Sequence, residues 1–194
     1  MLFHFGAPCC PGLDTAAGRA RLEAVCREHL TPAGQQQVAR ALEQMDLTGQ
    51  QLHAGRAELA AIGRHVTGAR ALAGQLYGAG PVTALAMTCW LGGAGRFTAS
   101  RKAVRFTGLD ITVYSPAGKR APGHLSKQGL PVLRWLLYEA AKTSARAGAP
   151  GHQYYAQAKD RIDGKRAALS QARRLVRHGT HILAAPGDDA FAPC

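Results

Sequence analysis

Two serines lie in a glycine- and proline-rich stretch that also carries several basic side chains. Ser115 is followed by Lys119 and Arg120, and Ser126 is followed directly by Lys127. A serine hydroxyl can attack a phosphodiester and form a phosphoserine link, but it is a weak nucleophile that needs a base and nearby positive charge. The basic side chains could supply that charge. Taken alone, a serine in such a loop is usually a turn residue, and no serine-hydrolase elbow is present.

A glycine turn before an apolar stretch is a second candidate site. Gly78 and Gly80 precede Pro81, and Thr83 follows in the first turn of the expected helix. The free N–H groups and the dipole at such a helix start suit a phosphate oxygen. The turn is similar to that of helix-hairpin-helix modules, which contact the nucleic-acid backbone without reading bases. A plain turn between two helices explains the same residues equally well.

The positive charge lies mostly in the second half of the chain. The chain has 24 Lys and Arg and 12 Asp and Glu, and residues 96–194 hold 17 of the basic and 6 of the acidic residues. Concentrated positive charge attracts a polyanion, and binding is favoured further by the release of counterions. The charge distribution therefore favours nucleic acid as a partner over a solubilising surface alone. Further basic candidates for phosphate contact are Arg134, Lys165, Arg166, Arg173 and Arg174.

The elements that must position these residues are expected to be mainly α-helical. Thr31 and Pro32 are typical of a helix start, and apolar residues at seven-residue spacing from Val38 to Val66 predict a long arm over residues 31–72. This arm could form a coiled coil or lie on its own domain.

Residues 73–184 predict a small helical domain with the glycine turn and at most a short β element, at residues 111–114. Its helices are expected near residues 81–91, 100–106, 131–144 and 164–183, with a loop over 115–129. Residues 1–30 and 185–194 are expected to be irregular or disordered.

Other classes of protein fit the sequence less well. Residues 71–95 carry no charge and could span a bilayer, but their glycines and Pro81 divide them into two short helices, so no membrane span is expected. The N-terminus has no basic region before its apolar stretch and does not predict a signal peptide. The five cysteines form no CxxC pair, so we expect no metal site, no disulfide framework and a cytoplasmic location.

The order of these motifs resembles the C-terminal domain of the bridge-RNA-guided serine insertion-sequence transposases, the group numbered one hundred and ten. In chain order, the resembling segments are the glycine turn at 78–84, Arg96-Phe97, residues 103–109, Ser115, Lys127-x-Gly129 with Leu133-Arg134, and the basic helix at 165–175. The sequence departs from the family pattern at Pro116, where glycine is expected after the serine, and at Leu130, where asparagine is usual.

The resemblance implies a mobile-element transposase or site-specific DNA recombinase. It implies DNA cleavage and rejoining through a phosphoserine at Ser115, with Ser126 as the second candidate. It further implies DNA and a guide RNA as partners, assembly as a dimer or tetramer, and a place in the bacterial cytoplasm at the nucleoid.

That family also carries an N-terminal RuvC-like domain whose carboxylates bind magnesium. The residues before 33 are too few, and too poor in acidic side chains, to form it. The expectation is therefore a truncated copy with no cofactor of its own and no standalone activity. The alternative is a non-catalytic nucleic-acid-binding helix-hairpin-helix module, and a third interpretation is a helical protein–protein adaptor.

Overall fold

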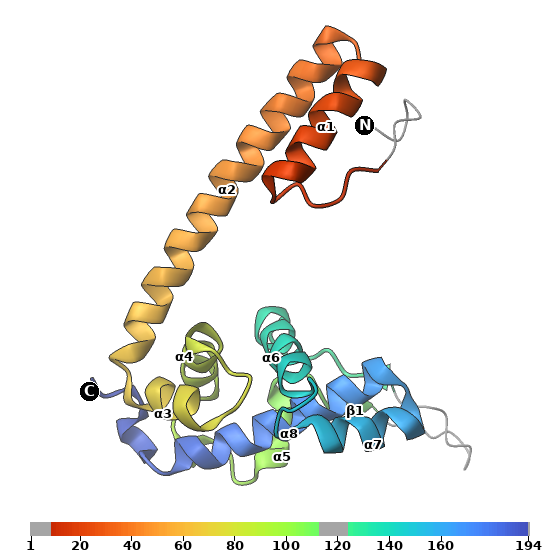
Figure 1. The fold of residues 1–194 in the computed structure, drawn as a ribbon. Coiled ribbons are helices and arrows are strands. Elements are labelled where there is room, and N and C mark those ends of the chain that lie inside the picture. Colours follow the sequence, from red (N-terminus) through yellow and green to blue (C-terminus); the bar gives the residue numbers. More distant parts are fainter. Residues whose placement is uncertain (1–8, 113–123, 194) are drawn as a thin grey trace. The chain divides into compact units, whose positions relative to one another are not determined.

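The computed structural model describes residues 9–112 and 124–193 (Figure 1). Contacts divide the chain into two compact units, Met1–Gly55 and Arg56–Cys194. The described residues form α-helices, two 3-10 turns and one two-stranded ribbon. This confirms the mainly α fold. In the described part of the chain, no helix is long and apolar enough to cross a membrane.

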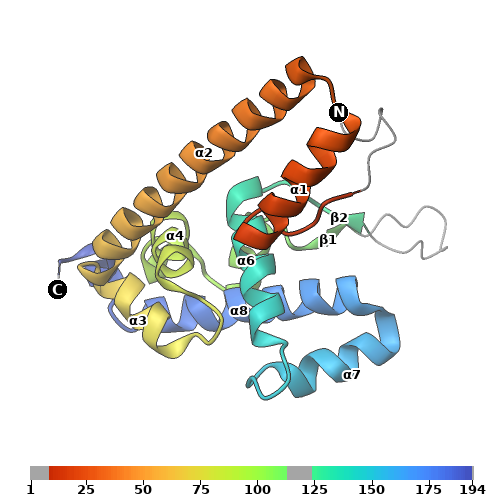
Figure 2. The same cartoon turned by 45° about the horizontal axis from the view of Figure 1, so that its top comes forward.

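The first unit is a helical hairpin. Helix α1 (Ala16–His29) lies along the beginning of α2 (Pro32–Arg64), as Figure 2 shows. A small core joins the two, in which Leu22, Cys26 and Leu30 are buried against the partly buried Val38 and Leu42. Irregular structure was expected over residues 1–30, and α1 corrects this for residues 16–29. Its apolar residues at a spacing of four form a stripe that α2 covers.

The start of α2 agrees with the sequence, but its end does not. The Thr31 hydroxyl accepts a hydrogen bond from the Gly34 N–H at 3.3 Å, as an N-cap side chain does. The helix ends at Arg64 rather than near residue 72, and α3 (Thr67–Gln75) follows after a break. Along α2, Met45, Leu52 and Leu59 of the seven-residue row are exposed. The coiled coil therefore stays a prediction.

The second unit is built around its last long helix, α8 (Gly164–Ala184), which contacts α3, α5, α6 and α7 (Figure 1). The bounds of the other elements are α4 (Pro81–Leu91), η2 (Ala94–Arg96), α5 (Ser100–Phe106), β1 (Ile111–Thr112), β2 (His124–Leu125), α6 (Pro131–Ser144), α7 (His152–Ile162) and η4 (Gly187–Phe191). Proline begins both α4 and α6, where its missing N–H has no helical partner to lose.

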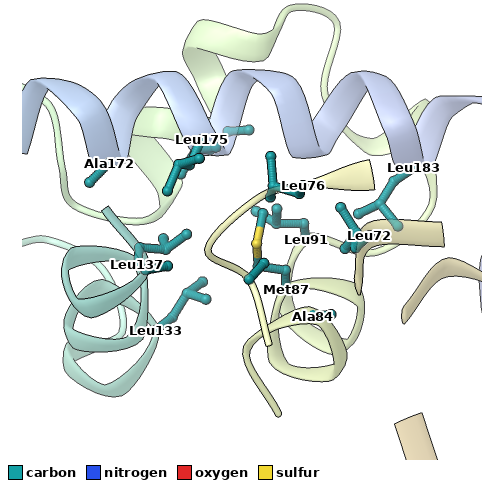
Figure 3. Packing of buried hydrophobic residues seen from close by; sticks show 14 of the residues in the cluster. Leu72, Leu76, Ala84, Met87, Leu91, Leu133, Leu137, Ala172, Leu175 and Leu183 are labelled. Carbon is teal, nitrogen blue, oxygen red and sulfur yellow. The ribbon is translucent and has the colours of Figure 1, made fainter. Parts of the chain in front are cut away.

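The core of this unit lies between α4, α6 and α8. Figure 3 shows Met87 of α4 among leucines from the neighbouring elements, with Leu137 of α6 and Leu175 of α8 nearby. Met87 and Leu137 have no exposed surface. Gly179 of α8 lies so close to Met87 that an added Cβ would stand 2.4 Å from its Cε. This close packing holds the candidate elements in place.

Two segments of the second unit differ from expectation. Helix α7 was not predicted from the sequence. The tail at 185–194 was expected to be disordered, but η4 forms there, and Ala190 is fully buried. The Thr67 N–H and hydroxyl both donate to the Ala192 carbonyl, at 3.1 and 2.9 Å. The tail is ordered because it completes the core beside α3.

Candidate nucleic-acid interface

The stretch that carries Ser115 is anchored at both ends by a short antiparallel ribbon. Ile111 pairs with Leu125, and Thr112 pairs with His124. The residues between, 113–123, lie outside the described part of the chain, and they include Ser115, Lys119 and Arg120. The structure therefore defines where this stretch begins and ends, whereas the position of Ser115 stays a prediction.

Ser126, the second candidate nucleophile, lies at the base of this ribbon beside a carboxylate. Its N–H donates to the Asp110 carbonyl at 2.9 Å, and its hydroxyl donates to Oδ1 of the same residue. The other carboxylate oxygen of Asp110 lies 4.0 Å from Arg105 Nε. The fold thus assembles a hydroxyl, a carboxylate and a guanidinium in one place. Nothing in the sequence indicated Asp110 and Arg105 as neighbours of Ser126, because residues 111–125 separate them along the chain.

Two glycines allow the segment that follows Ser126 to pack closely against the segment that follows α5. An added Cβ on Gly129 would stand 2.4 Å from the Thr107 carbonyl carbon, and one on Gly108 would stand 2.6 Å from the Gly129 N–H nitrogen. Gly108 also has a positive φ of 69°, which favours glycine. These contacts set the position of Lys127, which is exposed and has a φ of 55°.

Arg134 of α6 faces the same turn. Its guanidinium donates to the Gly129 carbonyl at 3.3 Å, and the residue is partly buried. One role of Arg134 is therefore to hold the turn that carries Lys127. The predicted phosphate contact of Arg134 is untested.

The two glycines of the turn before α4 lie in different surroundings. Gly78 has a φ of 93°, and an added Cβ would stand 2.5 Å from the Ala140 carbonyl oxygen of α6. Close packing against α6 thus explains why glycine stands at position 78. Gly80, the N-cap of α4, has an ordinary φ of −66° and no atom within 4 Å of an added Cβ. The space at Gly80 is open to an approaching nucleic-acid strand, whereas Thr83 is partly buried and less accessible.

The predicted basic residues of α8 lie at two places along the helix. Lys165 and Arg166 are exposed in its first turn, where the N-cap Asp163 lies 3.5 Å from Arg166 Nε. Arg173 and Arg174 lie two turns later. Arg173 donates to the Leu109 carbonyl at 2.5 Å, next to Asp110, and so connects α8 to the base of the ribbon.

Arg173 and Arg174 line a cavity of about 210 Å³ with Arg177, Ser170 of α8 and Tyr154 of α7. We call this the arginine pocket. Burial lowers the pKa of Arg173. Tyr154 and the Asp110 carboxylate act against this shift, and the nearby Arg177 acts with it. Arginine nevertheless stays charged in proteins, so the pocket is strongly cationic.

Arg173 and Arg174 are predicted from the sequence, whereas Arg177, Ser170 and Tyr154 are not. The helical spacing of residues 170, 173, 174 and 177 could have indicated one face of α8. Nothing in the sequence places Tyr154 beside that face, because the turn between α7 and α8 depends on Asp163 at a φ of 96°.

The magnesium ions that the resemblance implies would need clustered carboxylates. Within residues 9–112 and 124–193, no three or more His, Cys, Asp or Glu side chains come together in a way that could hold a metal ion. We therefore assign no chemical step to a metal bound by the described residues.

Residues 70–156 match the family model described as Transposase IS116/IS110/IS902 family. No curated protein matches the chain. The matched segment runs from α3 into α7 and includes the glycine turn, both candidate serines and Arg134. Over these residues, the chain is thus similar to transposases of insertion sequences.

Proposed function

We propose that this chain is a transposase component that binds DNA and cleaves and rejoins it through a serine. The family match over residues 70–156 is the observation that carries this proposal, because it spans both serines and the elements around them. The cationic second half of the chain and the arginine pocket support DNA as the substrate.

The proposed reaction is a reversible transfer of a phosphodiester to the serine oxygen. A bond forms between Oγ and phosphorus, the bond from phosphorus to one sugar oxygen breaks, and the freed sugar oxygen takes up a proton. In the second step, a sugar hydroxyl attacks the phosphoserine and releases the serine. Nearby cations, with Lys119, Arg120 and Lys127 as candidates, would stabilise the charge on the phosphoryl oxygens.

Ser115 is the first candidate for this role, since it stands where the family resemblance has its nucleophile. Ser126 is the second, and its surroundings support it. The carboxylate of Asp110 already accepts the hydrogen bond from the Ser126 hydroxyl, so it stands where a base would receive the proton. A guide RNA and assembly as a dimer or tetramer are further parts of this proposal, and they rest on the resemblance.

A covalent protein–DNA adduct is the direct test. The full chain is incubated with a random-sequence duplex library, denatured, treated with nuclease, and analysed by mass spectrometry for a nucleotide remnant on serine. If the chain forms the phosphoserine without the RuvC-like domain that the resemblance implies, the natural chain gives the adduct and Ser115→Ala loses it.

The control is Ser100→Ala at the start of α5, which should retain the adduct. Loss in Ser126→Ala alone would transfer the nucleophile role to Ser126. Binding of the library without an adduct would contradict serine chemistry by this chain on its own and favour a non-catalytic nucleic-acid-binding module.

A further inference from the structure

Two cavities of the second unit meet at one arginine. Arg174 lines the arginine pocket, and it also lines a neighbouring cavity of about 190 Å³. The second cavity, which we call the amide pocket, is lined among others by Tyr77, Ser144, Gln171 and His178. Tyr77 stands directly before the glycine turn. The fold thus places that turn beside the basic face of α8.

The arginine pocket has the chemistry of a phosphate site. Within the described residues, no carboxylate lines it, and none forms an ion pair with Arg173, Arg174 or Arg177. Arg174 lies with its guanidinium carbon 5.0 Å from the centre of the Tyr154 ring, which orients it. Three guanidinium groups around one cavity repel each other until an anion joins them. Their planar N–H donors match the oxygens of a phosphate.

The amide pocket offers a different set of groups. Tyr77 is 54% exposed, so a face or edge of its ring is open to a ligand. The Gln171 side chain is 97% buried, its Nε2 donates to the Ser144 hydroxyl at 2.9 Å, and that hydroxyl donates to the Ala141 carbonyl at 3.1 Å.

The remaining oxygen of that amide, Gln171 Oε1, is buried and has no hydrogen-bond partner among the described residues. A buried acceptor without a partner is costly, and an N–H group brought by a ligand would satisfy it after a small local movement. Gly151 leaves room for this amide, since an added Cβ would stand 2.3 Å from Gln171 Nε2. A flat ring with N–H groups on its edge fits these surroundings.

We propose that the two pockets together bind one unpaired nucleotide of a DNA strand. The phosphate lies among the arginines of the arginine pocket, and the base enters the amide pocket beside Tyr77 with an N–H directed at Gln171. A base within a duplex cannot enter, because its edge is paired and its faces are stacked. The choice of DNA rests on the proposed function, whereas the preference for an unpaired strand follows from the pockets.

The test compares the binding of a labelled single-stranded oligonucleotide and its duplex to the full chain by fluorescence anisotropy. The double variant Arg174→Gln/Arg177→Gln should bind both forms more weakly. Its plot of log affinity against log salt should be less steep by about 1, the contribution of one phosphate contact. Tyr77→Ala should weaken binding of the single strand about tenfold and leave the duplex nearly unchanged.

Arg161→Gln is the matched control, because Arg161 is an exposed arginine of α7 that lines neither pocket. If the double variant behaves like this control, or if Tyr77→Ala weakens both forms of DNA equally, the inference is wrong even when the natural chain binds DNA and forms its adduct. If the natural chain binds no DNA, the proposed function fails with it. Tenfold tighter binding of RNA of the same sequence would overturn the assignment to DNA.

Discussion

Among single residues in the described part of the chain, the hydrogen bond between Ser126 and Asp110 is the contact that bears most directly on the proposed chemistry. A hydroxyl that donates to a carboxylate is held in one rotamer, and its oxygen lone pairs stay available. The same contact closes the base of the stretch that holds Ser115, because residues 110 and 126 flank the paired strands. In the proposed reaction, this pair would therefore support either of the two candidate serines.

A double-mutant cycle measures this contact. Asp110→Asn and Ser126→Ala should each lower the free energy of unfolding by about 1 kcal/mol, the lower end for a hydrogen bond to a charged group that is partly exposed. The double variant should lose less than the sum, because both changes remove the same bond. Urea denaturation of the full chain gives all the values, and strictly additive losses would show that the bond contributes nothing.

The sequence could indicate the two serines and most of the cations, but it could not show which groups surround them. Ser115 was identified through the order of short motifs around it, and Arg173 and Arg174 through their place in a basic helix. Asp110 and Tyr154 become neighbours of these residues only in the folded chain. The contact of Asp110 with Ser126 lies next to the pairing of β1 with β2, and the place of Tyr154 beside α8 follows the turn at Asp163, which has a positive φ.

At the scale of elements, replacing glycine by alanine should have different effects on stability at two positions. Gly129→Ala should destabilise the second unit by about 2 kcal/mol, because its Cβ would collide with backbone atoms of residues 106–108 that cannot move freely. Gly80→Ala should be neutral or slightly stabilising, because its φ is ordinary and the space around it is open. Thermal or urea unfolding compares the two variants. Equal losses of unfolding free energy would contradict the close packing of the turn that follows β2.

The helical hairpin of the first unit predicts a response to acid. Hydrogen bonds from Arg19 lower the pKa of Asp46 below its ordinary value of about 3.9. Because the folded state holds this carboxylate ionised, its contribution to stability is present above the unfolded pKa and is lost as the pH falls through the folded pKa.

Asp46→Asn should therefore lower the urea midpoint of the hairpin at neutral pH. The difference from the natural chain should begin to shrink as the pH falls below about 4 and should vanish below the lowered folded pKa. The measurement is the helical circular dichroism signal of both proteins in urea at several pH values. A difference that stays constant with pH would show that the ion pair does not stabilise the hairpin.

Local signals predicted the elements that begin with proline or carry a strong apolar face, namely α2, α4, α6 and α8. They failed for α1, α7 and η4. Helix α1 has few large apolar residues and packs on α2, and η4 packs against α3, α4 and α8. Such elements are stabilised by packing between distant parts of the chain, which local propensity does not contain.

At the scale of the whole molecule, the distribution of charge agrees with the division into units. The formal net charge is +12, and nearly all of the excess lies within residues 96–194, in the second unit. The family match also lies within that unit. Binding to DNA is therefore expected to reside in the second unit, where the arginine pocket, Lys127 and the start of α4 lie.

The claim on which the account depends is that the chain binds DNA through its phosphates. Fluorescence anisotropy of a labelled DNA duplex, titrated with the full chain between about 50 and 200 mM salt, tests it most directly. We predict that binding weakens steadily with salt, with a log–log slope of about −3 or steeper, as for three or more phosphate contacts. An absence of binding at the lowest salt, or an affinity independent of salt, would contradict it.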